Sequence, residues 1–491
     1  MREVLRAVFK TGSGSAISML LNVVSSKIIA VITGPFGIGF YSMIQQLVRT
    51  ASTAGAIGGG GVALTQGVAC RKNQARDDFI VAVFWIFTIG AFLTSLALLF
   101  FAPWIALFAF GVNDEATVWL VRWLALPVAL MIALTYLNGV LNGFREIGRL
   151  ALIQITGSGV TAILSYPVSI LVDTGYFVAF IGMMTISISA QIIVGLIKAY
   201  RQKYLHPIIL NGFRLQIRRD AANSFFQIAG TLFFTSIFSS VILLVVRALI
   251  VQYNSLADAG IFNVAWVICM GYPIIILGSF GTYYFPTLSK ATKQHERLIL
   301  ITDVFRLSTL LIVPLLIIMI VLKPLIIDIF YSEEFYNSLT IMRWMLIGIY
   351  FKTATWVFAM PMLAFADMKI YFWTENFWFA GFLGFSLLAV VTFSNLEIIG
   401  LGFLVLYAIY LIYTIHYTHS RHGFTLNKRW IIIWVNGLIL IIVASILTWS
   451  ETRIDVPMTI IWVAVSISFL LLSITKQERR HLWDIVIRRK I

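Results

Sequence analysis

Residues 79–101 read FIVAVFWIFTIGAFLTSLALLFF and contain no charged side chain. A membrane-spanning helix needs about 20 consecutive apolar residues to cross a hydrocarbon core of roughly 30 Å. The strands of a β-barrel would instead alternate apolar and polar residues, and this pattern is absent from the stretch. The segment therefore predicts one membrane-spanning α-helix.

The whole 491-residue chain has the same character, with 60% hydrophobic and 12% charged residues and a mean hydropathy of +0.93. In soluble domains about a quarter of the residues are charged. The apolar runs predict fourteen spans, near residues 13–33, 38–68, 79–101, 117–142, 150–172, 177–199, 224–252, 258–288, 304–328, 337–366, 370–394, 397–419, 429–449 and 457–475. We therefore expect an all-α polytopic membrane protein.

Two further features refine this prediction. The first apolar run is long and is followed by GPFG rather than by a small-residue cleavage site, so we expect it to remain as the first helix. The two cysteines, Cys70 and Cys269, fall near or within predicted spans. Neither a disulfide framework nor a metal site is therefore expected.

The basic residues predict the orientation. If the N-terminus is cytoplasmic, the cytoplasmic segments hold 27 of the 36 lysines and arginines, whereas the outer loops hold only Arg453. Cytoplasmic loops of membrane proteins carry such an excess of basic residues. We therefore expect both termini in the cytoplasm. The net charge of +15 is explained by this topology, and no nucleic-acid partner is expected.

A repeat relates the two halves of the chain. VRWLALP (121–127) and MRWMLIG (342–348) each place an arginine before a tryptophan, and the separation of Arg122 from Arg343 defines the repeat offset. Gly39 and Gly260 are separated by the same offset, and Lys27 and Arg247 by one position less. Because this offset contains six predicted helices, both copies would enter the membrane from the same side, as in transporters built from parallel repeats.

The predicted organisation is therefore two six-helix lobes, related by a parallel pseudo-two-fold repeat, and two additional C-terminal helices. The expected segments are an N-terminal lobe at 1–199, a cytoplasmic linker at 200–222, a C-terminal lobe at 223–420, and a helix pair with a basic cytoplasmic tail at 421–491.

Eight cations lie within or near the ends of predicted helices. A charge at the bilayer centre costs roughly 2.5 to 3.5 kcal/mol on insertion scales, so such a residue faces a cavity or a partner, or extends its side chain to the surface. Arg306 and Lys323 are expected to reach the surface. For Arg122 and Arg343, near the outer boundary, both interpretations stay open.

Four cations lie deeper. Lys27 precedes Gly34 by seven residues, or about 10 Å of helix, and Arg247 is placed similarly. Arg49 and Lys352 lie near mid-depth. For these we favour a cavity over the membrane surface.

A polar stripe runs beside one of these cations. Ser42, Gln45, Gln46, Arg49 and Thr53 recur at intervals of three and four residues, which places them on one face of a helix. This face is expected to contact water or substrate. The alternative is a polar seam packed against another helix.

A cationic, polar interior complements an anionic solute that is rich in hydroxyl groups. A lipid-linked sugar pyrophosphate is such a solute, because its head cannot cross hydrocarbon unaided whereas its polyprenyl tail can. In this interpretation, Arg122 and Arg343 provide cations toward the outer end of a shared cleft, and the neighbouring tryptophans lie at the interface or stack on a sugar ring.

Three motifs resemble a known family. GPFGIGFYSMIQQLVRT (34–50), LNGFREIGR (141–149) and YFPTLSKAT (284–292) are similar to the corresponding stretches of Wzx-type O-antigen and lipid III flippases, in the multidrug/oligosaccharidyl-lipid/polysaccharide (MOP) exporter superfamily. The resemblance covers about the first 420 residues. Those flippases commonly have twelve spans, whereas fourteen, predicted here, is typical of the related lipid II flippases.

The resemblance implies a central cavity open alternately to either side of the bacterial inner membrane, and export of undecaprenyl-pyrophosphate-linked oligosaccharide, such as an O-antigen repeat unit for lipopolysaccharide. It implies membrane lipids and polysaccharide polymerase machinery as partners, and no cofactor. Family cavities are cationic, and the matching positions here are Lys27, Arg49, Arg247 and Lys352.

Several alternatives remain. The chain could flip lipid II or another polysaccharide precursor, or it could export drugs as MATE-type transporters do, although the first helix carries Lys27 and no acid. A polymerase or glycosyltransferase is disfavoured because the outer loops are short, so no enzyme activity and no catalytic residue is expected. Glu375 could couple transport to protons or could pair with a cation.

Overall fold

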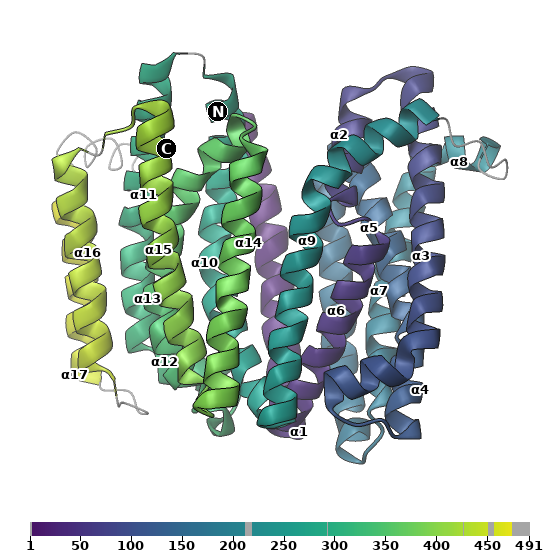
Figure 1. Ribbon diagram of the computed structural model, residues 1–491, viewed down its shortest axis with the longest axis horizontal. Helices are drawn as coiled ribbons and strands as arrows, with labels where there is room; N and C mark the ends of the chain where they lie inside the picture. Colours follow the sequence, from purple (N-terminus) through teal and green to yellow (C-terminus); the bar gives the residue numbers. More distant parts are fainter. Residues whose placement is uncertain (1, 212–218, 292, 426, 450–455, 474–491) are drawn as a thin grey trace, which may run out of the picture. The chain divides into compact units, whose positions relative to one another are not determined.

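The computed structural model describes residues 2–211, 219–291, 293–425, 427–449 and 456–473, and these ranges contain helices and no strands (Figure 1). Twelve of the described helices are long and apolar enough to cross a membrane. The expected all-α, multi-pass membrane protein is thus confirmed. Arg453, residues 212–218 of the predicted linker and the basic tail after residue 473 lie outside the described residues.

The first predicted span leads directly into the second. Helix α1 (Arg2–Gly55) contains the first span and the first part of the second, and it bends at Gly34, whose φ of 60° and ψ of −165° are not helical. Glycine tolerates this conformation, and Pro35 cannot donate a helical hydrogen bond there. The predicted span 38–68 is itself interrupted, because α1 ends at Gly55 and α2 (Gly60–Cys70) follows a turn with positive φ at Ile57 and Gly58.

The first of two compact units comprises Met1–Asn263, Phe330–Glu334 and Val390–Ser394. After α2, its further helices are α3 (Asn73–Phe110), α4 (Glu115–Trp123), α5 (Ala125–Gly143), α6 (Ile147–Asp173), α7 (Val178–Arg201), α8 (His206–Asn211) and α9 (Arg219–Tyr253). In this unit α6 packs against α1 and α7, and α3 packs against α5 and α9.

Helix α10 (Leu256–Lys290) begins in the first unit and meets α1 through two glycines. A Cβ on Gly39 would lie 1.8 Å from the carbonyl oxygen of Leu256, and a Cβ on Gly260 would lie 2.1 Å from that of Pro35. Only glycine permits backbones this close. The two contacts are reciprocal within the repeat, because at the repeat offset Pro35 corresponds to Leu256 and Gly39 to Gly260.

The second unit comprises Val264–Ile329, Phe335–Ala389 and Asn395–Ile491. Beyond α10, its helices are α11 (Gln294–Val321), α12 (Lys323–Phe330, except its last residue), α13 (Ser338–Ala364), α14 (Met368–Leu387), α15 (Glu397–His422), α16 (Lys428–Leu447) and α17 (Val456–Ser473). The 3-10 turn (Glu333–Phe335) and the π-helical end of α14 (Leu388–Thr392) are divided between the two units. Helix α13 packs against α15 and α11.

The last two helices dock on α11 and, through α16, on α13. The Tyr350 ring stacks on Trp434 at 5.1 Å between ring centroids, and the Tyr350 hydroxyl donates to the Trp434 carbonyl at 2.8 Å. Lys323 is only 1% exposed, and its ammonium group donates to the carbonyl of Thr448. The prediction that Lys323 reaches the membrane surface is therefore wrong, because a backbone carbonyl distant in sequence binds the charge inside the unit.

Helix boundaries also recur at the repeat offset. Helices α3 and α11 begin at Asn73 and Gln294, and α6 and α14 begin at Ile147 and Met368, so that both pairs are separated by this offset. The ends of α5 and α13, and those of α7 and α15, are separated in the same way. The repeat, the count of fourteen helices and the predicted lobe boundaries stay predictions.

Candidate functional site

A buried arginine forms the centre of a polar cluster in the first unit. Arg247, on α9, is 8% exposed. It donates hydrogen bonds to Gln46 Oε1 on α1 at 2.6 Å and to Asn263 Oδ1 on α10 at 2.9 Å. Both acceptors are neutral, and the Nε atom of Arg247 has no hydrogen-bond partner. Within the described ranges, no carboxylate lies within ion-pair distance of Arg247, so its charge is not neutralised.

Gln46 is itself held in place. Its amide nitrogen donates to the carbonyl of Ser240 at 3.0 Å and to the Thr50 hydroxyl at 3.3 Å. The amide oxygen is therefore turned toward Arg247. The helix pair α1 and α9 thus fixes the guanidinium through an ordered side chain rather than through an ion pair.

A second arginine lies beside the first. Arg49 is one helical turn after Gln46 and is exposed, and it is close enough to Arg247 for the two positive charges to repel each other. No ion pair of Arg49 occurs among the described residues. Two like charges within membrane-spanning helices are unfavourable without a counter-charge. Among the described residues, the pair is therefore left without a counter-charge, and its role in binding an anion stays a prediction.

The polar stripe on α1 divides in two. Ser42 and Gln46 are 2% and 4% exposed, respectively, and both form hydrogen bonds inside the unit. Gln45 and Arg49 are exposed, and Thr53 is half-buried. Ser42 and Gln46 are thus packed inside the unit, whereas Gln45 and Arg49 are exposed, and contact of this stripe with water or substrate stays a prediction.

Lys27 lies in the first arm of α1 and is half-buried. Its ammonium group donates to the backbone carbonyl of Tyr331, which belongs to the same unit. Close to the bend of α1, the carboxylate of Glu334 is 2.8 Å from where a Cβ on Gly34 would be. Lys27 is therefore partly bound by the protein.

Lys352 forms a second cationic position, in the other unit. It is half-buried on α13, and its Nζ atom is 3.1 Å from the Sδ atom of Met270 and 5.3 Å from the centroid of the Tyr407 ring. A thioether and an aromatic face are weak partners for an ammonium group. These two contacts thus give Lys352 no strong hydrogen-bond acceptor, and its role in binding an anionic group stays a prediction.

Glu375, on α14, faces this region. It accepts a hydrogen bond from the Tyr410 hydroxyl at 2.9 Å, and the same hydroxyl is 3.2 Å from Thr374 Oγ1. Glu375 and Lys352 attract each other electrostatically, but the two side chains form no direct ion pair. A proton carried by Glu375 would alter the charge beside Lys352.

The two Arg-Trp motifs contain arginines that contact aromatic rings. Arg122 lies 5.1 Å from the centroid of Trp119, one turn earlier on the same helix. Arg343 lies 4.4 Å from the centroid of Trp449, just after α16. Within their own units, neither arginine joins the clusters around Arg247 and Lys352. Their predicted role in a cleft stays a prediction.

Sequence reasoning missed several partners of these cations. Asn263 was recognisable only as one of many polar residues within spans, and Met270 and Tyr407 have no polar signature. No group of three or more histidine, cysteine or acidic side chains that could hold a metal ion occurs among the residues the structure describes.

Comparisons with known proteins identify the family. The model of a family described as "Polysaccharide biosynthesis protein" matches residues 63–340, more than half of the chain. The lipid III flippases of Escherichia coli (strain K12) and Shigella flexneri are each 26% identical over 387 residues, covering 76% of this chain and 88% of theirs.

Solved structures show the same fold. The lipid II flippase MurJ in an inward closed conformation is similar with a TM-score of 0.70 and 14% identity, covering 96% of this chain and 98% of that chain. An inward-facing multidrug transporter of the MATE family has a TM-score of 0.63 and 14% identity, covering 82% and 94%. The chain therefore belongs to the polysaccharide biosynthesis protein family and has the fold of MOP-superfamily transporters.

Proposed function

We propose that this protein is a flippase that moves an undecaprenyl-pyrophosphate-linked oligosaccharide, such as an O-antigen repeat unit, from the inner to the outer leaflet of the bacterial inner membrane. The curated relatives support this proposal, because their names give lipid III as the molecule they flip. The protein would act as a transporter rather than as an enzyme.

The observation that carries the proposal is the arginine pair on α1 and α9. Arg247 is held by two neutral amide oxygens, and Arg49 adds a second positive charge beside it. Guanidinium groups form strong, paired hydrogen bonds to phosphate oxygens. A pyrophosphate would supply the missing counter-charge and would accept the remaining donors of both side chains.

The proposed mechanism is alternating access. The pyrophosphate binds while the cavity is open to the cytoplasm, and the two lobes then rock so that the same cations release it outward. Lys27 and Lys352 would lie along the same path, and Arg122 and Arg343 toward its outer end. The polyprenyl tail would stay in the lipid throughout.

The proposed topology places both termini in the cytoplasm. Counting the two arms of α1 separately and adding α10 to the remaining spans gives fourteen helices. The reciprocal contacts of Gly39 and Gly260 support a parallel repeat, because equivalent positions contact each other across a two-fold axis.

We further propose that Glu375 links transport to protons. Its protonation would strengthen the positive potential around Lys352, and its ionisation would weaken anion binding there. The alternative role, an electrostatic partner that positions Lys352, predicts no dependence of transport on the proton gradient.

A depletion strain provides the test of the flippase function. In bacteria depleted of their own flippase for such a precursor, expression of this protein should clear the polyprenyl-linked intermediate from the inner leaflet. Arg49→Ala and Lys352→Ala should leave the intermediate in place. Arg306→Ala is the matched control, because this arginine stacks on Trp430 at 4.7 Å and lies outside the proposed site.

The outcomes separate the alternatives. If Arg49→Ala and Lys352→Ala both retain full transport, the cationic path is wrong even if the protein is a flippase. If the wild-type protein clears no lipid-linked intermediate but lowers the accumulation of an organic cation, the protein is a drug exporter.

A further inference from the structure

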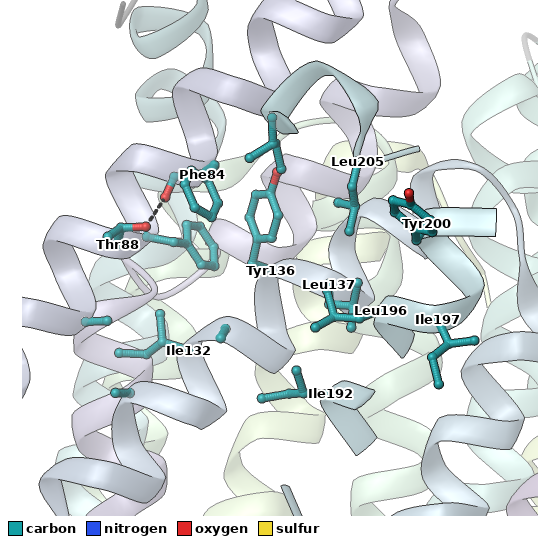
Figure 2. A pocket seen from close by; sticks show the side chains of 15 residues that line it. Phe84, Thr88, Ile132, Tyr136, Leu137, Ile192, Leu196, Ile197, Tyr200 and Leu205 are labelled. Carbon is teal, nitrogen blue, oxygen red and sulfur yellow. Dashed lines mark hydrogen bonds between the residues drawn. The ribbon is translucent and has the colours of Figure 1, made fainter. Parts of the chain in front are cut away.

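An apolar pocket with a volume of about 730 Å³ opens in the first unit, between α3, α5, α7 and α8 (Figure 2). Two hydroxyl groups among its lining residues donate hydrogen bonds to backbone carbonyls rather than into the pocket. Thr88 donates to Phe84 at 2.8 Å, and Tyr136 donates to Ile80 at 2.9 Å. The surface presented by α3 and α5 is therefore almost entirely hydrocarbon.

Small side chains leave this space open. Ala91 on α3 and Ala129 on α5 line the pocket, and the positions that correspond to them at the repeat offset are Ile312 and Tyr350. In the second unit, Tyr350 stacks on Trp434 of α16, so that larger rings occupy the equivalent space. The first unit has alanines and an unfilled pocket instead.

One end of the pocket is basic. Tyr200 and Leu205 line it there, Arg201 and Lys203 lie between them in the sequence, and Lys198 precedes them. The nearby acid is Glu146, which accepts a hydrogen bond from Tyr204 at 2.6 Å. Arg201 and Lys203 are exposed. Helix α8, which follows, packs against α3. The apolar pocket is thus lined at this end by a chain segment that also carries two exposed cations.

We propose that this pocket binds an acyl chain of an anionic membrane phospholipid, whose phosphate group contacts Arg201 and Lys203. Basic clusters beside membrane-spanning helices bind anionic lipid head groups. The lining of α3 extends only from Phe84 to Ala91, or about 10 Å of helix. This is too short for a docked membrane-spanning helix and matches part of an acyl chain.

Native mass spectrometry of the delipidated full-length protein tests the proposal. The protein is titrated with dioleoyl phosphatidylglycerol, which is anionic, and with dioleoyl phosphatidylcholine, which is zwitterionic. The variants are Ala133→Phe, which fills the pocket on α5, and the pair Arg201→Gln with Lys203→Gln. The matched controls are Ala97→Phe, at an exposed position of α3 outside the pocket, and Lys290→Gln with Lys369→Gln, two exposed lysines elsewhere.

The wild-type protein should bind phosphatidylglycerol more tightly than phosphatidylcholine. Removing two cations should weaken phosphatidylglycerol binding about thirtyfold and weaken phosphatidylcholine binding much less, because choline neutralises its phosphate. Ala133→Phe should weaken the binding of both lipids. Because Arg201 and Lys203 are exposed, that pair stays informative even if Ala133→Phe fails to fold.

Equal binding of the two lipids by the wild-type protein would overturn the proposal, as would unchanged phosphatidylglycerol binding in the Arg201 and Lys203 variant. A dimer that Ala133→Phe dissociates would also overturn it, since the pocket would then be an interface between two copies. Because the experiment measures lipid binding and the mass of the protein rather than transport, a negative result would not argue against the proposed flippase function.

Discussion

Replacing Arg247 with glutamine tests whether the charge of this side chain serves substrate transport or the stability of the fold. The arginine gains two hydrogen bonds to neutral oxygens, each worth about 1.5 to 3 kcal/mol when one partner is charged. Against this, burying an arginine within a membrane helix costs up to roughly 2.5 to 3.5 kcal/mol, the value that insertion scales give for the helix centre. The two bonds together, at about 3 to 6 kcal/mol, offset this cost, and a glutamine amide can still donate to one of the two oxygens.

Arg247→Gln should therefore change the free energy of unfolding by less than about 2 kcal/mol in either direction. Transport should respond very differently. Loss of one charged contact to a pyrophosphate, at about 1.5 to 3 kcal/mol, should lower the transport rate at subsaturating substrate by roughly 10-fold to 150-fold.

The assay pairs two measurements on the same purified variant. Reversible unfolding in SDS reports stability, and proteoliposomes loaded with a lipid-linked oligosaccharide report translocation. Arg306→Gln is the matched control and should transport normally. Full transport by Arg247→Gln would refute the anion-binding role, and a loss of stability above about 4 kcal/mol would show that Arg247 is mainly structural.

Three other contacts lead to testable expectations. Lys352→Met should lower transport and change the thermal midpoint of the purified protein little, because the charge that it removes has a thioether and a ring as direct partners but also attracts Glu375; full transport would contradict the account. Gly39→Ala should destabilise the protein by about 1 to 3 kcal/mol, because the added Cβ clashes with the Leu256 carbonyl. Gly182→Ala should not destabilise it, since a Cβ there meets nothing within 4 Å. Thermal unfolding followed by size exclusion compares the two variants. Burial and then the hydrogen bond to Glu146 raise the pKa of Tyr204, so the contribution of this bond is fully present below the ordinary tyrosine pKa near 10 and is lost as pH rises through the higher folded value. Hydrogen exchange of residues 203–205, corrected for intrinsic rates, should show this alkaline loss of protection in the wild-type protein and none in Tyr204→Phe.

Local sequence predicts the helices well and their interruptions poorly. Apolar runs of about 20 residues can only be satisfied as helices in a bilayer, so the span at 79–101 lies inside α3 as expected. The turn at Ile57 and Gly58 splits a predicted span because a run of glycines there breaks the helix without a change in hydropathy. Hydropathy alone cannot detect such a break.

The site was predictable only in part, and for a related reason. Spacing placed Gln46 and Arg49 on one face of a helix, and depth marked Arg247 as unusual. The hydrogen bond between Gln46 and Arg247 joins residues 201 positions apart, which no periodicity reveals. Lys323 is buried rather than at the surface because its ammonium group donates to a carbonyl 125 residues away, a contact that local sequence does not reveal.

The most direct test of the central claim is the affinity of the purified protein for a lipid-linked oligosaccharide pyrophosphate, measured beside an analogue with an uncharged linker. The wild-type protein should prefer the pyrophosphate, and the double variant Arg49→Gln with Arg247→Gln should lose this preference while still folding. Equal affinity of the wild-type protein for the charged and uncharged ligands, or an unchanged preference in the double variant, would contradict the claim that this arginine pair binds the pyrophosphate.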